Sequence, residues 1–262
     1  MAVGVKVLDL FAGLRGWADP WAARGHETFT VDLDPAFDVD SHTDIFELRA
    51  ADLPWRPDVI LASPPCERFS VLQIGRNWTG PDDFPPHQPK TEEAKLALAL
   101  VEATRRLIAE CAPAFFVIEN PRAKLRKLAV VADFDRVTVA YCQYGEPFQK
   151  PTDLWGGFPP SWHPRPMCKP KSGCHVSAPR GSKTGIQGPA VAELREPSTA
   201  NKDAQRQHYG IPRGADSKGT ATRATLAALR SKIPAALSLE LCRAAERDLE
   251  AGYVGTVKGR LF

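Results

Sequence analysis

The sequence predicts an α/β protein whose strands form a parallel sheet, with a small loop-rich domain inserted toward the C-terminal end. Short strand-like runs recur at residues 5–10, 27–31, 59–62 and 115–118, and the last two are continuously apolar, as expected for strands of a buried sheet. Segments with helical spacing separate several of these runs, and that alternation favours a parallel sheet. From residue 156 to 222 the periodicity disappears and Gly, Pro and basic residues dominate, which predicts the inserted domain.

Length and composition narrow the class of protein further. A chain of 262 residues with 43% hydrophobic and 25% charged residues is typical of a soluble protein with one large domain, with or without a small second one. No apolar run approaches the roughly 20 residues that span a bilayer, and a strand begins too early to leave room for a signal peptide. Six scattered cysteines favour a reducing compartment over a disulfide scaffold. We therefore expect a cytoplasmic monomer that contacts no membrane.

The first two strands lead into residues suited to a small ligand. The run 5–10 enters a glycine-containing turn at residues 11–16, followed by a short helix that reaches residue 23. Such a turn lets backbone amides approach a ligand closely, although it also serves as a plain strand–helix connection. The second strand, 27–31, ends at Asp32, where dinucleotide-binding folds place a ribose-binding carboxylate. Asp34-Pro35, just beyond it, has the sequence of a turn.

A cysteine follows the third strand directly. The run 59–62 leads to Ser63-Pro64-Pro65-Cys66, and two prolines cannot continue a strand. Most free cysteines are small buried hydrophobic residues, but Cys66 lies at the carboxyl end of a strand, where open α/β sheets bind their ligands. A catalytic thiol and a packed thiol are both compatible with this position.

The segment 71–89 is polar, rich in Gly and Pro, and longer than a plain connection. It is predicted to act as a lid, the alternative being a disordered insertion.

Thr91 then caps a helix over 91–111, in which the spacing predicts that Leu96 and Cys111 belong to the core. A buried strand at 115–118 delivers Glu119, and residues 137–142 predict a strand in which Cys142 packs. The apolar pattern over 226–249 predicts a helix that docks back on the sheet.

Four stretches, taken together and in order, resemble the C5-cytosine DNA methyltransferase family and most of all its small phage-type members. The stretches, which cover about the first 155 residues, are 9–17 (DLFAGLRGW), 64–70 (PPCERFS), 118–121 (IENP) and 144–147 (YGEP) with Lys150. The family has an S-adenosylmethionine-dependent Rossmann-like sheet with an inserted target-recognition domain. The resemblance implies a catalytic and cofactor-binding domain at 1–155 plus 223–262, and a target-recognition domain at 156–222.

The resemblance also implies which residues bind S-adenosylmethionine. Asp32 is expected to hold the ribose, and Asp44 with Ile45 the adenine. The whole expected set is Phe11, Gly13, Leu14, Gly16, Asp32, Asp44, Ile45 and Pro64. This chain departs from the family at Arg15, where most members have glycine. A side chain there restricts the positive φ that glycine adopts freely.

The implied reaction begins when the Cys66 thiolate adds to C6 of a cytosine that has been flipped out of duplex DNA. C5 then attacks the methyl group, while a protonated Glu119 stabilises the ring at N3. The family's Gln-x-Arg-x-Arg set is replaced here by residues 148–152. Lys150 supplies a charge without an arginine's fork, and Thr152 can donate to the cytosine O2. Pro121 stands where the family has an aliphatic residue.

Basic residues cluster in the C-terminal third. Between His163 and Lys232 there are 13 Lys and Arg against 4 Asp and Glu, a balance that favours contact with a phosphate backbone over a merely solvated surface. Arg180 and Lys183 are the expected DNA contacts, because their run, 180–185, lacks the Walker spacing of a nucleotide-binding loop. Either Gln73 or Arg76, from the predicted lid, is expected to fill the gap left by the flipped base.

A zinc site is a further possibility. His163, Cys168, Cys174 and His175 are residue types that bind zinc in a tetrahedron, and a loop-rich domain gains stability from a metal. The set has no CxxC pair, and simple loop residues are the alternative.

Two other functions remain open from the sequence: an RNA (tRNA) cytosine-5 methyltransferase, and a non-catalytic nucleic-acid-binding protein with the same fold. A nicotinamide-dependent enzyme is disfavoured because the first loop lacks GxGxxG. The DNA target, and whether 5-methylcytosine is the end product, do not follow from the sequence.

Overall fold

The computed structural model describes residues 4–169, 172–175 and 231–255, and it contains one six-stranded sheet. The strand order is β2-β1-β3-β4-β6-β5. The strands are β1 (Lys6–Leu10), β2 (Glu27–Val31), β3 (Val59–Ala62), β4 (Phe115–Pro121), β5 (Asp135–Ala140) and β6 (Pro151–Gly157), and the helices are α1 (Ala18–Ala22), α2 (Ile74–Asn77), α3 (Glu92–Cys111) and α6 (Ala235–Glu250). The α/β class predicted from the sequence is confirmed.

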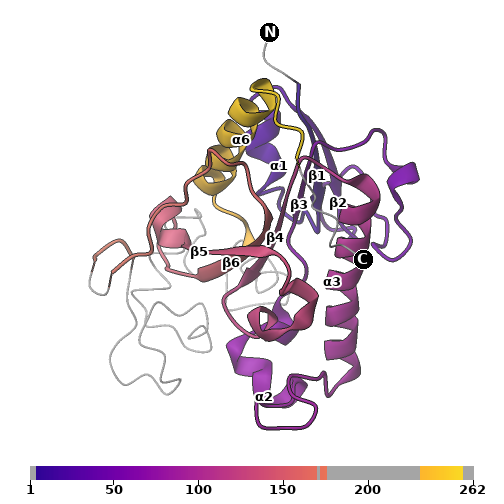
Figure 1. The fold of residues 1–262 in the computed structure, drawn as a ribbon, viewed down its shortest axis with the longest axis vertical. Coiled ribbons are helices and arrows are strands. Elements are labelled where there is room, and N and C mark those ends of the chain that lie inside the picture. The colour runs from indigo at the N-terminus through magenta and orange to yellow at the C-terminus, as the bar shows by residue number, and fades with distance from the viewer. Residues whose placement is uncertain (1–3, 170–171, 176–230, 256–262) are drawn as a thin grey trace.

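Helices cover both faces of the sheet, with α3 on one face and α1 beside α6 on the other (Figure 1). The strands divide their side chains between two cores. On β4, Phe116 and Ile118 belong to the core under α3, whereas Phe115 and Val117 belong to the core under α1 and α6. Because both faces are buried there, β3 and the first part of β4 read as continuous apolar runs, which is why the sequence revealed them.

The helix α3 begins and ends as the sequence predicts. The Thr91 side chain accepts a hydrogen bond from the Ala94 amide, and Glu92 and Glu93 lie in the first turn, where the helix dipole favours acidic groups. Cys111 is buried in the core as expected, but Leu96 is 54% exposed. The expectation for Leu96 was wrong because it lies outside the stripe of α3 that faces the sheet.

The predicted parallel sheet is only partly correct. The neighbours β2, β1, β3 and β4 run parallel, whereas β6 is antiparallel to both β4 and β5. At Gly156 a Cβ atom would collide with the Phe116 carbonyl on β4, so glycine allows the two backbones to approach. Since β6 is reversed, its first residues lie at the carboxyl edge of β4, and Thr152 pairs with Pro121.

The region after β5 also differs from the prediction. The strand ends at Ala140, and Tyr141–Tyr144 form a short 3-10 turn closed by Gly145, whose φ is +98°. Cys142 therefore lies in a turn and not in a strand. Farther along, α6 packs against α1, and Ile233, Leu237 and Leu241 enter the core that α1 covers. Within the described residues, no helix is long and apolar enough to cross a membrane.

Candidate active site

A cavity of about 870 Å³ opens at the carboxyl edge of the parallel strands. At one end it is lined by Cys66, Glu119 and Lys150, and at the other by the turn after β1 and the residues after β2. The parallel strands bring these groups together because their carboxyl ends share one edge. Every residue expected to bind the cofactor lines this cavity, namely Phe11, Gly13, Leu14, Gly16, Asp32, Asp44, Ile45 and Pro64.

Two side chains hold the loop that carries Cys66. Trp17 donates from Nε1 to Ser63 Oγ at 3.0 Å, and Asn120, on β4, donates from Nδ2 to the Pro64 carbonyl at 2.9 Å. Asn120 is completely buried, so this bond is shielded from competing water. The loop that carries Cys66 is thus held on one side by Trp17, just before α1, and on the other by Asn120 on β4.

Glu119 is buried with one hydroxyl and one ammonium as neighbours. Tyr141 donates from its hydroxyl to Glu119 Oε1 at 2.9 Å, and Lys150 Nζ lies 3.7 Å from the same oxygen. Burial is the main cause that raises the pKa of Tyr141 well above 10, so the phenol stays protonated and donates. Both contacts involve Oε1, which leaves Oε2 as the oxygen available to a ligand.

Lys150 combines charge with an unusual backbone conformation. Its φ is +32°, and Nζ lies 4.3 Å from the centre of the Tyr141 ring. Burial raises the pKa of the Cys66 thiol to about 11, and the Lys150 ammonium partly opposes that rise. Near neutral pH the thiol therefore holds its proton in this state of the protein, and a bound substrate or a base has to favour the thiolate.

Thr152 lies close to this group but does not line the cavity. It is completely buried, and its Oγ1 donates to the Lys150 carbonyl at 3.1 Å. This bond supports the backbone of Lys150, so the expected contact of Thr152 with a ligand has no counterpart in this geometry. Tyr141 was missed as a site residue because its contact with Glu119 depends on how β4 and the turn after β5 pack.

At the other end of the cavity, Asp32 organises the turn. Its Oδ2 accepts from the Gly13 amide at 2.9 Å, and its Oδ1 accepts from the Asp34 amide at 3.0 Å. Each carboxylate oxygen has a further acceptor site, so Asp32 can still receive ribose hydroxyls. Asp44 accepts the Phe46 amide through Oδ1 at 2.9 Å, beside the buried side chain of Ile45.

Arg15 corrects one expectation, because its φ is +54° despite its side chain. The guanidinium compensates for the cost of this conformation: Nε donates to Asp19 Oδ1 at 3.1 Å and Nη1 to Thr30 Oγ1 at 3.2 Å. The turn therefore keeps the left-handed backbone conformation that glycine adopts easily, although an arginine occupies the position.

Residues 71–89 are folded, so the alternative of a disordered insertion is wrong. Trp78 is buried, stacks on Phe69 at 5.5 Å and donates to the Arg68 carbonyl at 2.7 Å. Gln73 ends the 3-10 turn Val71–Gln73, and the exposed Arg76 lies in α2. Neither lines the cavity in this structure. Arg180 and Lys183, like the boundary at 222/223, lie outside the described residues.

The Cys/His set differs from the expected one by one residue. Cys142, Cys168, Cys174 and His175 place their sulfur and nitrogen atoms within 4.8 Å of one another. His163 is exposed and its Nδ1 lies 3.1 Å from the Ser161 carbonyl, away from this group. Cys142 takes its place, because the turn after β5 brings a residue assigned to packing next to a segment that follows β6.

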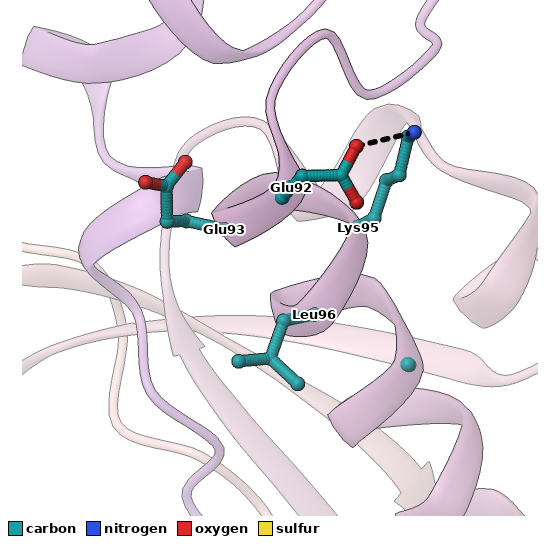
Figure 2. Close-up of a pocket in the computed structure, with 5 residues that line it drawn as sticks. Glu92, Glu93, Lys95 and Leu96 are labelled. Atoms are coloured by element: carbon teal, nitrogen blue, oxygen red, sulfur yellow. Dashed lines mark hydrogen bonds and ion pairs between the residues drawn. The ribbon is translucent and has the colours of Figure 1, made fainter.

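A second hollow, on the first turns of α3, offers no comparable chemistry (Figure 2). Its volume is about 480 Å³, and it is lined by Glu92, Glu93, Lys95, Leu96 and Ala99. An ion pair of 2.7 Å joins Lys95 to Glu92, and both side chains are exposed, so the pair is a surface feature.

The chain is similar to known methyltransferases. It is 32% identical over 180 residues to a Frog virus 3 (isolate Goorha) protein named "Probable DNA (cytosine-5)-methyltransferase", an alignment that covers 65% of this chain and 78% of the viral protein. No family model matches the chain.

Among solved structures, the Entamoeba histolytica methyltransferase EhMeth aligns with a TM-score of 0.55 at 10% identity, covering 94% of this chain and 99% of that one. The shared fold is thus the Rossmann-like fold of methyltransferases. The S. pombe Dnmt2 methyltransferase aligns with a TM-score of 0.38 at 15% identity, and this alignment covers 58% of this chain and 48% of that one.

Proposed function

Because this chain belongs to the DNA (cytosine-5)-methyltransferase family, we propose that it transfers a methyl group from S-adenosylmethionine to C5 of cytosine in duplex DNA. The observation that carries the proposal is a single cavity with a thiol, a buried acid and a lysine at one end and the Gly13–Asp32–Asp44 group at the other. One cavity thus has residues suited to the cytosine at one end and residues suited to the cofactor at the other.

The cofactor-side residues suit S-adenosylmethionine by their chemistry. Asp32 offers acceptors to ribose hydroxyls, and Asp44 with Ile45 offers an acceptor and an apolar side chain to adenine. The turn at Gly13, with φ +49°, presents its backbone to the same space. When bound, S-adenosylmethionine supplies an electrophilic methyl group; the protein's own residues activate the cytosine.

The activation starts at Cys66. Its sulfur forms a bond to C6, and the electron pair of the C5–C6 double bond moves into the ring toward N3. Glu119 holds the proton between its Oε2 and N3, and the Tyr141 hydroxyl on Oε1 fixes the orientation of the carboxyl group. C5 takes the methyl group, and S-adenosylhomocysteine is the leaving group. Solvent water then accepts the C5 proton as the bond between C6 and sulfur breaks, N3 returns its proton to Glu119, and the C5–C6 double bond and the thiolate are restored.

Lys150 acts on the same residues by its charge. It lies beside Glu119 and favours the ionised form of Cys66. When the cytosine enters the cavity and displaces water, the local dielectric constant falls, and this electrostatic effect of Lys150 becomes stronger. The cytosine has to leave the duplex to reach this depth. We assign the filling of the gap to Gln73 or Arg76, and the backbone contacts to the basic stretch with Arg180 and Lys183.

Tritium transfer tests the reaction. The protein, tritiated cofactor and mixed-sequence duplex DNA should give labelled 5-methylcytosine. Absence of label on DNA by protein that binds the cofactor would refute the proposal, and label on tRNA alone would replace it with RNA methylation.

Covalent trapping tests the role of Cys66. Duplex DNA with 5-fluorocytosine should leave an adduct on a denaturing gel, because fluorine blocks the loss of the proton at C5. Cys66→Ala should give none and should lose activity by roughly a thousandfold or more. The matched control is Cys111→Ser, on α3 and away from the cavity, which should still trap.

Calorimetry tests the cofactor end. Asp32→Ala should weaken binding of S-adenosylmethionine by about 1.5–3 kcal/mol, the value of a hydrogen bond to a charged group. Asp38→Ala, at an exposed position outside the cavity lining, is the control. An unchanged affinity in Asp32→Ala would assign the ribose to Asp34.

A further inference from the structure

Four side chains with metal-binding atoms gather next to the turn that follows β5. Cys142 belongs to that turn, while Cys168, Cys174 and His175 come from the chain after β6. Cys174 Sγ lies 3.6 Å from Cys142 Sγ and 3.2 Å from His175 Nδ1. In a tetrahedral zinc site with Zn–S bonds of about 2.3 Å, two sulfurs are about 3.8 Å apart. The observed spacing is close to that of ligands around one ion.

Hydrogen-bond donors surround the sulfurs as they do in metal sites. Gln149 donates from Nε2 to Cys168 Sγ at 2.7 Å, and Gln143 donates from Nε2 to Cys174 Sγ at 3.4 Å. Ser172 Oγ lies 2.8 Å from Cys174 Sγ. A metal-bound thiolate accepts such bonds, and they orient the ligands and moderate their charge.

We propose that Cys142, Cys168, Cys174 and His175 bind one structural zinc ion. Three thiolates and an imidazole complete a tetrahedron without an open position, so the ion is closed to substrate. The site joins two segments that are separated in sequence by β6, and so it adds a cross-link where the chain has little regular structure.

A disulfide is a poorer explanation of the same cluster. It requires an S–S bond of about 2.05 Å, and three cysteines would leave one thiol unpaired. It also gives no role to His175.

The other group of possible ligands, His26, Cys242 and Glu246, is already explained without metal. The Val5 amide donates to His26 Nδ1, the Nε2 atom of the same ring lies 2.8 Å from Glu246, and Arg24 holds Glu246 with two bonds of 2.8 Å. These contacts occupy both ring nitrogens and both carboxylate oxygens.

The location suggests what the ion does, and this part rests on the proposed function. Cys142 directly follows Tyr141, the donor to Glu119, and Gln149 directly precedes Lys150. Cys174 and His175 lie near the beginning of the basic stretch 163–232, on the N-terminal side of Arg180 and Lys183. Zinc would therefore fasten the beginning of the DNA-contacting segment to the turn that orients the catalytic acid.

Metal analysis of the full-length protein tests the site without any activity measurement. Protein expressed with added zinc and purified without chelator should contain about one zinc per chain. Cys174→Ser and His175→Ala, at half-buried positions outside the sheet, should reduce this to near none while circular dichroism stays unchanged. His163→Ala, in the same segment but outside the cluster, should keep the full amount. Cobalt in place of zinc should give the visible absorption of a tetrahedral thiolate site, and Cys142→Ser should lose it.

Three outcomes would overturn the site. These are wild-type protein that contains no zinc under these conditions, a Cys142–Cys174 disulfide found by mass spectrometry, and zinc that persists in Cys174→Ser but is lost in His26→Ala. The result is separable from the proposed function: a protein with zinc that does not methylate DNA refutes the function alone, and an active protein without zinc refutes the site alone.

Discussion

The sheet consists of a parallel half, β2-β1-β3-β4, and an antiparallel pair, β5 and β6. Each part buries one carboxylate completely, and the two parts stabilise it in different ways. Asp9, on β1, accepts the Ala18 amide through Oδ2 at 3.1 Å, and its Oδ1 has no hydrogen-bond partner among the described residues. Burial raises the pKa of Asp9 to about 8. Asp153, on β6, instead receives two bonds from Arg126, at 2.8 and 2.7 Å, and one from Thr138 Oγ1 at 2.7 Å.

The difference shows two ways to keep a carboxyl group out of water. In the parallel half the group remains neutral by holding a proton, because it is buried and no cation among the described residues donates to it. In the antiparallel pair a cation neutralises it. Glu119 stands on β4, where the two halves meet, and its contacts are Tyr141 and Lys150, from the chain flanking β5 and β6. Glu119, the proposed catalytic acid, therefore belongs by sequence to the parallel half, while its contacts come from the segment between the two antiparallel strands.

The largest effect is expected from removal of the cation in the antiparallel pair. Arg126→Met leaves Asp153 charged and unpaired in the core, and should lower the free energy of unfolding by about 3–5 kcal/mol. Urea denaturation measures this loss. Lys127→Met, at the exposed neighbouring position, should change stability by less than about 0.5 kcal/mol. Similar small losses in both variants would show that the ion pair is not what stabilises Asp153.

The parallel half should respond to pH instead. Between pH about 4 and 8, Asp9 is protonated in the folded protein and ionised in the unfolded chain, so folding takes up a proton. Stability contributed by Asp9 is thus complete below pH 4 and falls by up to about 1.4 kcal/mol per pH unit as the pH rises toward 8. Asp9→Asn cannot ionise, so its stability relative to wild type should rise by roughly 2–3 kcal/mol from pH 5.5 to 7.5.

Urea titrations of both proteins across this pH range measure the difference. A constant offset between Asp9→Asn and wild type would mean that Asp9 is ionised in the folded protein, and the contrast between the two halves would disappear. Asp58→Asn, at a half-buried position where the carboxylate accepts the Lys6 amide, is the comparison for an acid outside the core.

A smaller effect is expected where the halves meet. Tyr141→Phe removes the donor to Glu119 and should lower kcat/KM for methyl transfer about tenfold, the loss of one hydrogen bond of about 1.4 kcal/mol. Cofactor affinity should not change. Tyr144→Phe is the control, because this tyrosine lies in the same turn but bonds the Arg165 amide. Equal losses in both variants would indicate general damage to the turn.

The smallest effect concerns the third donor to Asp153. Thr138→Val keeps the shape of the side chain and removes one hydroxyl, which should cost about 1 kcal/mol of unfolding free energy. Thr28→Val, on β2 at a half-buried position, should cost less. If Thr138→Val costs nothing, Arg126 alone is sufficient for Asp153.

The sequence by itself determined the strands of the parallel half and the residues at their ends. The segments 27–31 and 59–62 coincide with β2 and β3. The run 59–62 is apolar throughout because β3 is buried on both faces, and this is visible locally. Asp32, Cys66 and Glu119 follow from the same logic, since the carboxyl ends of parallel strands share one edge. The family resemblance rests on these same stretches.

Only the tertiary structure decided the direction of β6, the contact of Tyr141 with Glu119, and the place of Cys142 beside Cys168, Cys174 and His175. The apolar pattern of a strand reports that it is buried, and it is the same for either direction of the chain. Contacts between the turn after β5 and distant residues arise from packing across β6, which no local spacing encodes. For that reason the sequence pointed to His163 as the fourth member of the Cys/His cluster, whereas the folded chain supplies Cys142.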